Sequence, residues 1–286
     1  MFSEMKKEVN TFLLNYFENK GSFNKVIYDS ASYSLNIGGK RIRPLLMLLT
    51  YNMYKENWRE ILEFSSAIEM IHTYSLIHDD LPCMDNDDLR RGKPTNHKVY
   101  GEDIAVLAGD ALLNEAMNVM MKFSLNHGRE ALVASQKIAE AAGAEGMIGG
   151  QVVDIINEGK KISEEELRYM HMKKTGALIK VSIVAGAILG NASEEEIELL
   201  EKFGENLGLA FQIKDDILDV TGDVNKLGKN TLADGNKSNF ITMYGLEECK
   251  VMCEDLTAEC ITILDKISVN TDILKELTIE LLKRDF

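Results

Sequence analysis

Helix-breaking residues are scarce in this chain, and their scarcity limits what it can fold into. Proline, the strongest helix breaker, occurs only at Pro44, Pro82 and Pro94 in 286 residues. Leu, Ile, Ala, Glu and Lys are abundant, and hydrophobic residues make up 45% of the chain, which is enough for a large core. The sequence therefore predicts an all-α protein, a single large bundle of ten or more helices that forms one domain over residues 1–286.

The spacing of apolar residues predicts where these helices lie. A long loop is expected over residues 80–96, and Ser193-Glu194-Glu195-Glu196 has the sequence of a capping box. After about residue 220, glycines mark another loop, and two helices close the chain. The helices before that loop are expected over residues 2–20, 24–36, a stretch beginning near 40, 58–79, 103–122, 129–146, 163–189 with a kink near Lys174-Thr175-Gly176, and 193–220.

Charge and cysteine content exclude several classes of protein. The net charge of −14 argues against nucleic acid as a partner. The N-terminus lacks the apolar run of a signal peptide, and the apolar stretch 181–189 is too short to span a membrane. The four cysteines form no CxxC pair, so we expect reduced packing thiols. A soluble, cytoplasmic protein without membrane insertion is the expectation.

A dense acidic stretch follows the predicted helix 58–79. Two like charges 4 Å apart repel by about 4 kcal/mol at an effective dielectric of about 20, so a cation among them would relieve the repulsion. Mg²⁺ suits such a site because it takes one or two protein carboxylates together with water and phosphate oxygens. A solvated acidic loop that caps the helix is the alternative, whereas a calcium EF-hand loop is disfavoured by Arg90 where glycine is needed. The five carboxylates are Asp79, Asp80, Asp85, Asp87 and Asp88.

A second acidic cluster lies in the predicted helix 193–220. Asp215 and Asp219 are four residues apart and share a helix face, with Gln212 one turn earlier. Like charges at this spacing destabilise a helix unless they are paired or bind a metal. Two such clusters in apolar surroundings predict the facing walls of one metal site.

In these motifs the chain resembles the trans-prenyl diphosphate synthases, which extend isoprenyl chains head to tail. Asp79-Asp80, four further residues and Asp85, followed by Arg90-Arg91-Gly92, resemble the first aspartate-rich motif of that family. The stretch 215–219 (DDILD) resembles the second. The resemblance covers nearly the whole chain, because further blocks occur in the order of the family: 38–44 (GGKRIRP), 150–154 (GQVVD), 174–176 (KTG) and 228–229 (GK).

The resemblance implies a bundle around a central cavity and a metal-dependent prenyl transfer. An allylic diphosphate ionises, and the double bond of isopentenyl diphosphate attacks the carbocation. About three Mg²⁺ ions per site are implied, for which Mn²⁺ substitutes. Asp79 and Asp85 on one wall and Asp215 on the other would be direct ligands. Three further carboxylates would act through water or behind the ligands: Asp80, Asp216 and Asp219.

The same resemblance implies separate sites for the two diphosphates. The isopentenyl diphosphate would be held by Lys40, Arg43, His72 and Arg91. The allylic diphosphate would be held by Arg90, Lys174, Lys229 and Lys237, with Thr175 and Gln212 lining its pocket. The catalytic set is then Asp79, Asp85, Asp215, Arg90 and Lys174. A homodimer is also implied.

Two observations from the residues bear on this assignment. Cations at a helix start, here Lys40, Arg41 and Arg43, oppose the helix dipole, which indicates either a nearby anion or a basic surface turn. Leu232 stands where relatives often carry glycine, which weakens the transfer of roles to Lys229 and Lys237.

The resemblance implies that the growing chain runs from the Asp79 end of this helix into a pocket between helices. Residues about one turn before Asp79 would line that pocket, because helical side chains lean toward the N-terminus. Ser75 is small, whereas the ring of Tyr74 is large enough to close the pocket after about three isoprene units. Alternatively, Tyr74 is an ordinary core residue. The prediction is a C15 product, farnesyl diphosphate, with the C20 product as the alternative.

Three other functions compete. A hydrolase of the HD type would use His78-Asp79 and His72, but it needs more histidine ligands and leaves the second cluster unexplained. A class I terpene cyclase normally replaces the second aspartate-rich motif. A non-catalytic regulatory subunit would lose one or both motifs, and this chain keeps both.

Overall fold

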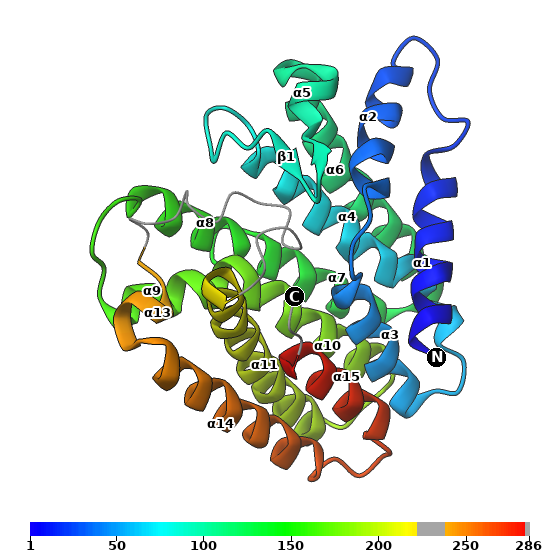
Figure 1. Cartoon of the computed structure of the whole chain (residues 1–286). Helices are drawn as coiled ribbons and strands as arrows, with labels where there is room; N and C mark the ends of the chain where they lie inside the picture. Colours follow the sequence, from blue (N-terminus) through cyan, green and yellow to red (C-terminus); the bar gives the residue numbers. More distant parts are fainter. Residues whose placement is uncertain (222–237, 284–286) are drawn as a thin grey trace.

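The computed structural model describes residues 1–221 and 238–283. It confirms the all-α prediction, with more than ten helices in this part of the chain (Figure 1). The strands of the described part are the two-residue pair β1 (Leu89–Arg90) and β2 (Lys93–Pro94), which form an antiparallel hairpin. The α-helices are α1 (Phe2–Phe17), α2 (Lys25–Asn36), α3 (Ile42–Tyr54), α4 (Leu62–Asp79), α5 (Asn96–Tyr100), α6 (Glu102–His127), α7 (Arg129–Ala142), α8 (Met147–Ile156), α9 (Glu164–His171), α10 (Ala177–Leu189), α11 (Glu194–Thr221), α13 (Phe240–Tyr244), α14 (Leu246–Leu264) and α15 (Asp272–Lys283).

Helix α10 forms the centre of the bundle. Every side chain of α10 except Lys180 is buried, as expected for a helix that is apolar on all sides. It packs against α3, α7 and α11, and α4 completes this inner layer beside α6 (Figure 1). The helices that carry the acidic motifs, α4 and α11, therefore belong to the rigid core.

The remaining helices cover this layer from two sides. α1 and α2 pack over α4 and α6, and α14 packs along α11 (Figure 1). Of the described helices, α6 alone is long and apolar enough to cross a membrane by length and composition. Its buried side chains pack against α2, α4 and α7, as those of a core helix do.

Several predicted boundaries need correction. The helix expected over 129–146 was predicted four residues too long, because α7 ends at Ala142 and a glycine-containing turn leads into α8. The helix expected over 58–79 begins with a 3₁₀ turn (Trp58–Ile61), where the Asn57 side chain accepts a hydrogen bond from the amide of Arg59. The loop 80–96 contains the small hairpin, which sequence periodicity did not indicate.

The helical pattern is irregular where the kink near Lys174-Thr175-Gly176 was predicted. Between α9 and α10 lies a π-helix, Met172–Gly176, whose backbone hydrogen bonds span five residues where those of an α-helix span four. The capping box predicted at Ser193 is half present. The amide of Glu196 donates to Ser193 Oγ at 3.2 Å, but the Glu196 carboxylate accepts hydrogen bonds from Ser268. A complete capping box, not predicted, joins Ser163 and Glu166 at the start of α9.

Candidate active site

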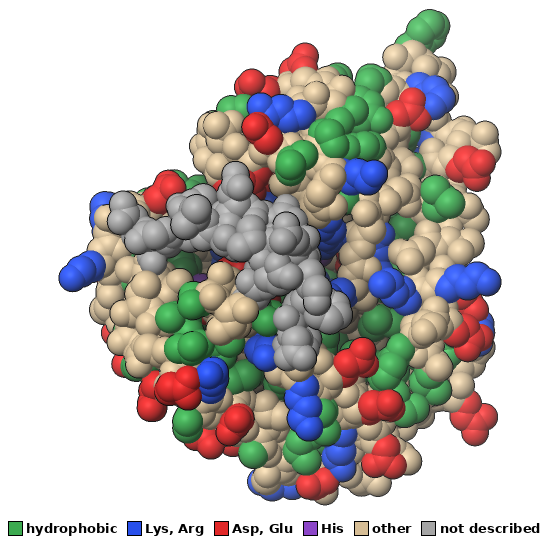
Figure 2. Space-filling model, in the orientation of Figure 1, with side chains coloured by type: hydrophobic (Ala, Val, Ile, Leu, Met, Phe, Trp, Pro, Cys, Tyr) green, Lys and Arg blue, Asp and Glu red, His purple; other side chains and the backbone are tan. Residues whose placement is uncertain are grey.

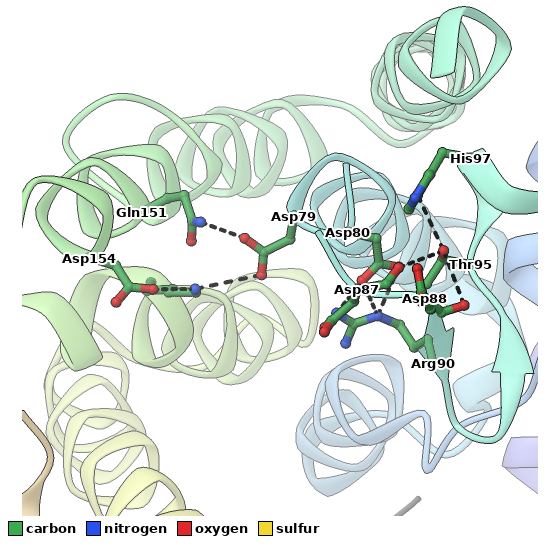
Figure 3. A network of polar contacts seen from close by, with 10 residues as sticks. Asp79, Asp80, Asp87, Asp88, Arg90, Thr95, His97, Gln151 and Asp154 are labelled. Atoms are coloured by element: carbon green, nitrogen blue, oxygen red, sulfur yellow. Dashed lines mark hydrogen bonds and ion pairs between the residues drawn. The ribbon is translucent and has the colours of Figure 1, made fainter. Parts of the chain in front are cut away.

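The buried helix α4 ends at Asp79, and the carboxylates of Asp79 and of the following residue, Asp80, point in different directions. A step of one residue turns the side chain by about 100° around a helix, so Asp79 and Asp80 diverge. Figure 3 shows Asp79 directed toward α8 and Asp80 directed toward the hairpin. Asp79 accepts a hydrogen bond from the side-chain amide of Gln151, and its Oδ2 lies 3.6 Å from Lys174 Nζ. The adjacent carboxylates thus serve two different surroundings.

Lys174 connects Asp79 to a third carboxylate. Its Nζ donates to Oδ2 of Asp154 at 2.6 Å, and Asp154 and Gln151 lie on one face of α8, three residues apart. Although burial alone would lower the pKa of Lys174, the charges of Asp79 and Asp154 raise it above its ordinary value. Lys174 is therefore a fixed cation at the acidic end of α4.

Asp80 forms a buried ion pair with Arg90. The Arg90 Nε lies 2.8 Å from Oδ1 and 3.0 Å from Oδ2 of Asp80, and Nη2 also donates to Oδ1, so two N–H groups of the guanidinium bind the carboxylate (Figure 3). Burial raises the pKa of Asp80 above its ordinary value, although Arg90 acts in the opposite direction. Arg90 also lies 3.6 Å from Asp87. The guanidinium predicted to hold the allylic diphosphate is engaged with its own loop, and its assignment stays a prediction.

The second acidic cluster lies on α11, as predicted. Gln212 Nε2 donates to Asp215 Oδ2 at 3.4 Å, and Gln212 Oε1 lies 3.0 Å from His171 Nδ1. Asp216 is buried and accepts a hydrogen bond from the amide of Phe240 at 2.8 Å, which fixes the start of α13. Asp219 is exposed at the end of the helix. Asp215 is therefore the member of this cluster that Gln212 contacts.

The oxygen donors of this region suit Mg²⁺. Among residues 1–221 and 238–283, no three His, Cys, Asp or Glu side chains converge on a point that could hold a metal. Such convergence is not required, because Mg²⁺ takes one or two carboxylates and completes its octahedron with water and phosphate oxygens. Asp79 and Asp85 are held next to each other, since the Asp85 amide donates to the Asp79 carbonyl at 2.9 Å. The donor set fits a metal that arrives with a diphosphate.

A basic corner lies on the side of α4 that faces α2. His72, Arg91 and Glu69 line a small cavity there, and an Arg91 Nη1 donates to the Gly38 carbonyl. Burial, with the charges of Arg43 and Arg91, holds the pKa of His72 well below its ordinary value. The Nε of Arg43 is buried and has no hydrogen-bond partner within the described part of the chain. On the face shown in Figure 2, basic side chains gather near the centre.

Arg41, which sequence reasoning counted only as one of three cations, holds this corner together. Its side chain is buried, and its Nη1 lies 2.8 Å from Glu69 Oε1 on α4, while its Nε donates to Asn10 of α1 at 2.8 Å. Its backbone is left-handed, with φ of 57°, directly before α3. This turn carries Lys40, whose side chain is exposed, and leads to Arg43.

The two residues predicted to set product length lie on α4. Tyr74 is buried in the core, with its ring edge-on to that of His78 at a centroid distance of 5.8 Å. Its hydroxyl is buried and finds no hydrogen-bond partner among the residues described. Ser75 donates to the carbonyl of His72 at 2.8 Å. Both positions stay predictions for chain length.

The structure thus pairs Asp79 with Lys174, Asp80 with Arg90 and Asp215 with Gln212, and it adds residues to which no role was assigned. Thr175 lies in the π-helix beside Lys174 and is half-buried. Lys229 and Lys237 lie outside the described residues. Gln151 and Asp154 were quoted as part of a motif without a role, and their spacing of three on a helix was the available signal. Glu69 gave no signal in the sequence.

Comparisons with known proteins agree with this geometry. Residues 24–277 match the model of the polyprenyl synthetase family. The chain is 42% identical to a farnesyl diphosphate synthase of Bacillus subtilis, over 99% of this chain and 97% of that protein. It is 46% identical to a chloroplastic geranylgeranyl pyrophosphate synthase of Capsicum annuum, over 82% of this chain and 64% of that protein.

A solved structure shares the fold as well. The geranyltransferase of Helicobacter pylori, in complex with magnesium and isoprenyl diphosphate, superposes with a TM-score of 0.86 at 34% identity, covering 98% of this chain and 95% of that one. Together with the two acidic clusters near the C-terminal ends of α4 and α11, these matches show that the chain belongs to the polyprenyl synthetase family.

Proposed function

We propose that the protein condenses isopentenyl diphosphate head to tail with dimethylallyl and geranyl diphosphates, giving farnesyl diphosphate and free diphosphate. The supporting observation is that α4 separates two environments for anions. Asp79 with Lys174 forms an acidic one, which needs metal ions to accept a phosphate, and Arg43, His72 and Arg91 form a basic one. Chromatography of dephosphorylated products formed from the two substrates tests the proposal; farnesol is expected, and absence of any elongated alcohol contradicts it.

The acidic environment suits the diphosphate that departs. When bound, Mg²⁺ would supply electrophilic stabilisation of the leaving group, held by Asp79, Asp85 and Asp215. Lys174, kept protonated by Asp79 and Asp154, adds a fixed positive charge, and Gln151 orients the Asp79 carboxylate. Thr175 and Gln212 line the same pocket, and Lys229 and Lys237 are proposed to add further cations. Such preorganised charges act where negative charge develops.

The basic environment suits the diphosphate that stays. The diphosphate is bound there by protein side chains and not by a metal ion, so it is held without being activated as a leaving group. These side chains are Lys40, Arg43, His72 and Arg91. A neutral His72 donates through one ring nitrogen. We assign removal of the final proton to the released diphosphate, because no side-chain base was predicted there.

The proposed product is farnesyl diphosphate, with geranylgeranyl diphosphate as the alternative. The Bacillus subtilis relative is a farnesyl diphosphate synthase, whereas the Capsicum annuum relative is a geranylgeranyl pyrophosphate synthase, which favours the C20 alternative. The buried ring of Tyr74, one turn before Asp79, supports the shorter product. We further propose a single domain, a cytoplasmic location, about three Mg²⁺ ions replaceable by Mn²⁺, and a homodimer. Exposed apolar side chains of Leu107, Met121 and Leu125 on α6 support the last of these.

The two diphosphate sites should separate in steady-state kinetics. Arg43→Ala should raise the KM for isopentenyl diphosphate by about 10- to 100-fold, because a charge-assisted hydrogen bond is lost there. Lys174→Ala should instead lower kcat/KM for the allylic substrate. Initial rates measured with each substrate varied in turn distinguish the two effects. Equal effects of both variants on both substrates would refute the partition.

His72 makes stability depend on pH. Its pKa is ordinary in the unfolded chain and well below that value in the folded protein, owing to burial and then to Arg43 and Arg91. Between these two pKa values the unfolded chain binds more protons, so the free energy of unfolding falls as pH falls below about 6.5. Urea unfolding at pH 7.5 and 5.5 should show this loss, and His72→Gln should reduce it. An unchanged pH dependence in His72→Gln would contradict the assignment.

A further inference from the structure

Helix α11 runs along α9, the π-helix and α10 in the opposite direction and touches them at three successive points. Near its start, a β-carbon on Gly204 would lie 2.9 Å from Cα of Lys180. One turn later, a β-carbon on Gly208 would lie 2.9 Å from Cα of Gly176. One more turn later, Gln212 meets His171 at 3.0 Å. At the first two points the backbones approach too closely for any side chain.

The spacing of these contacts differs between the two partners. Along α11 the contacts are four residues apart each time, at 204, 208 and 212. On the other side the first interval, from 180 to 176, is also four residues, but the second, from 176 to 171, is five. The additional residue of the π-helix falls in this interval. Lys174 therefore stands on a turn that is wider than the α-helical turns around it, and π-turns of this kind are frequent at functional sites.

A second glycine closes on the π-helix from the other side. Gly150 of α8 lies so near that a β-carbon there would overlap the backbone nitrogen of Lys174. Gly150 immediately precedes Gln151, which binds Asp79, and lies four residues before Asp154, which binds Lys174. The same stretch of α8 thus touches both the backbone and the amine of Lys174.

We propose that Gly208 and Gly150 are positioning residues that clamp the π-helix and so hold the amine of Lys174 against Asp79 and Asp154. This inference rests on the proposed role of Lys174 at the allylic diphosphate. A β-carbon on Gly208 forces the backbone at Gly176 to move, since neither atom belongs to a flexible side chain. The amine of Lys174 then shifts relative to Asp79, and misplacement by about 1 Å costs up to about 10²-fold in rate.

Gly204→Ala is the matched control. It introduces the same group on the same helix at the same distance from backbone, 2.9 Å from Lys180 Cα, but one turn away from the π-helix. Lys180 pairs with Glu201 and Glu205 and has no part in the proposed site. Both variants should lower the midpoint of thermal unfolding similarly, so a purely structural role predicts equal activity for the two.

The test is a kinetic comparison of the purified variants, with a double-mutant cycle. Gly208→Ala should lower kcat/KM for geranyl diphosphate by at least about 10-fold, with the KM for isopentenyl diphosphate changed less than about two-fold. Gly204→Ala should stay within about two-fold of the parent in both. In a Lys174→Ala background, Gly208→Ala should cost nothing further, because it acts through that amine.

Different failures are distinguishable. If Lys174→Ala lowers activity but Gly208→Ala matches Gly204→Ala, the positioning inference is wrong while the proposed site stands. An additive loss in the double variant overturns the inference as well. If Lys174→Ala leaves allylic kinetics unchanged, the proposed site itself is wrong. Gly150→Ala presses on the backbone of Lys174 from α8 more closely than Gly208→Ala presses on Gly176, and where it folds it must show the same selective loss of kcat/KM for geranyl diphosphate.

Discussion

Replacing Asp79 by alanine is expected to slow turnover by more than about 10³-fold while the protein remains folded. Loss of one preorganised electrostatic contact costs about 10²–10³-fold, and loss of a metal ligand should cost more. Asp79 is half-buried, and Gln151 and Lys174 direct it toward α8, so its removal takes away one predicted metal ligand and leaves Lys174 paired with Asp154 alone. Asp215→Ala should have a comparable effect from the opposite wall. Turnover and the circular dichroism spectrum of each variant are the measurements.

Asp88→Ala is the matched control for this experiment. Asp88 belongs to the same acidic stretch, but its carboxylate is exposed and pairs with Lys98 at 2.7 Å. It should retain nearly full activity. Parent activity should disappear in excess chelator and return when Mg²⁺ is added. Full activity with chelator present would contradict the proposed dependence on a metal ion.

Tyr74→Ala is expected to change the product from C15 to C20 or longer. The ring is buried in the core below the Asp79 end of α4, so its removal opens space for another isoprene unit. Truncating a buried aromatic residue costs about 3–5 kcal/mol of stability, and the assay should therefore be run well below the melting temperature. Chromatography of the dephosphorylated products from parent and variant is the measurement.

Tyr74→Phe separates the ring from its hydroxyl. The hydroxyl is buried and has no partner among the described residues, and burial raises its pKa, so removing it should not reduce stability. This variant should keep the C15 product. A C20 main product from the parent, or no lengthening in Tyr74→Ala, would show that Tyr74 does not close the pocket.

Local sequence patterns were enough to predict much of the fold and of the candidate active site. The scarcity of proline and the spacing of apolar residues predicted an all-α chain. The two acidic motifs predicted which helix ends carry the candidate active-site carboxylates. The irregular helical segment at Lys174 could also be predicted from the sequence, because a Lys-Thr-Gly motif interrupts a helical pattern there. The break between α7 and α8 was missed, since alanines around Gly143 kept the helical signal.

The features of the site that could not be predicted from the sequence depend on contacts between residues far apart in the chain. Asp79 and Asp80 are adjacent in sequence, but one is bound by Gln151, which is 72 residues away, and the other by Arg90. The sequence showed Arg41 only as one of three cations at a helix start, and it did not indicate the buried partner Glu69 on another helix. No periodicity in one segment reports such pairings, because they are set by how the helices pack.

The central claim is that one diphosphate departs and the other is retained. Geranyl diphosphate and isopentenyl diphosphate, each labelled with radioactive phosphorus in separate reactions, test it directly. All label from geranyl diphosphate should appear in free diphosphate, and all label from isopentenyl diphosphate should stay in the C15 product. Release of label from isopentenyl diphosphate when no product longer than C15 forms, or retention of the geranyl label in an elongated product, would contradict the account.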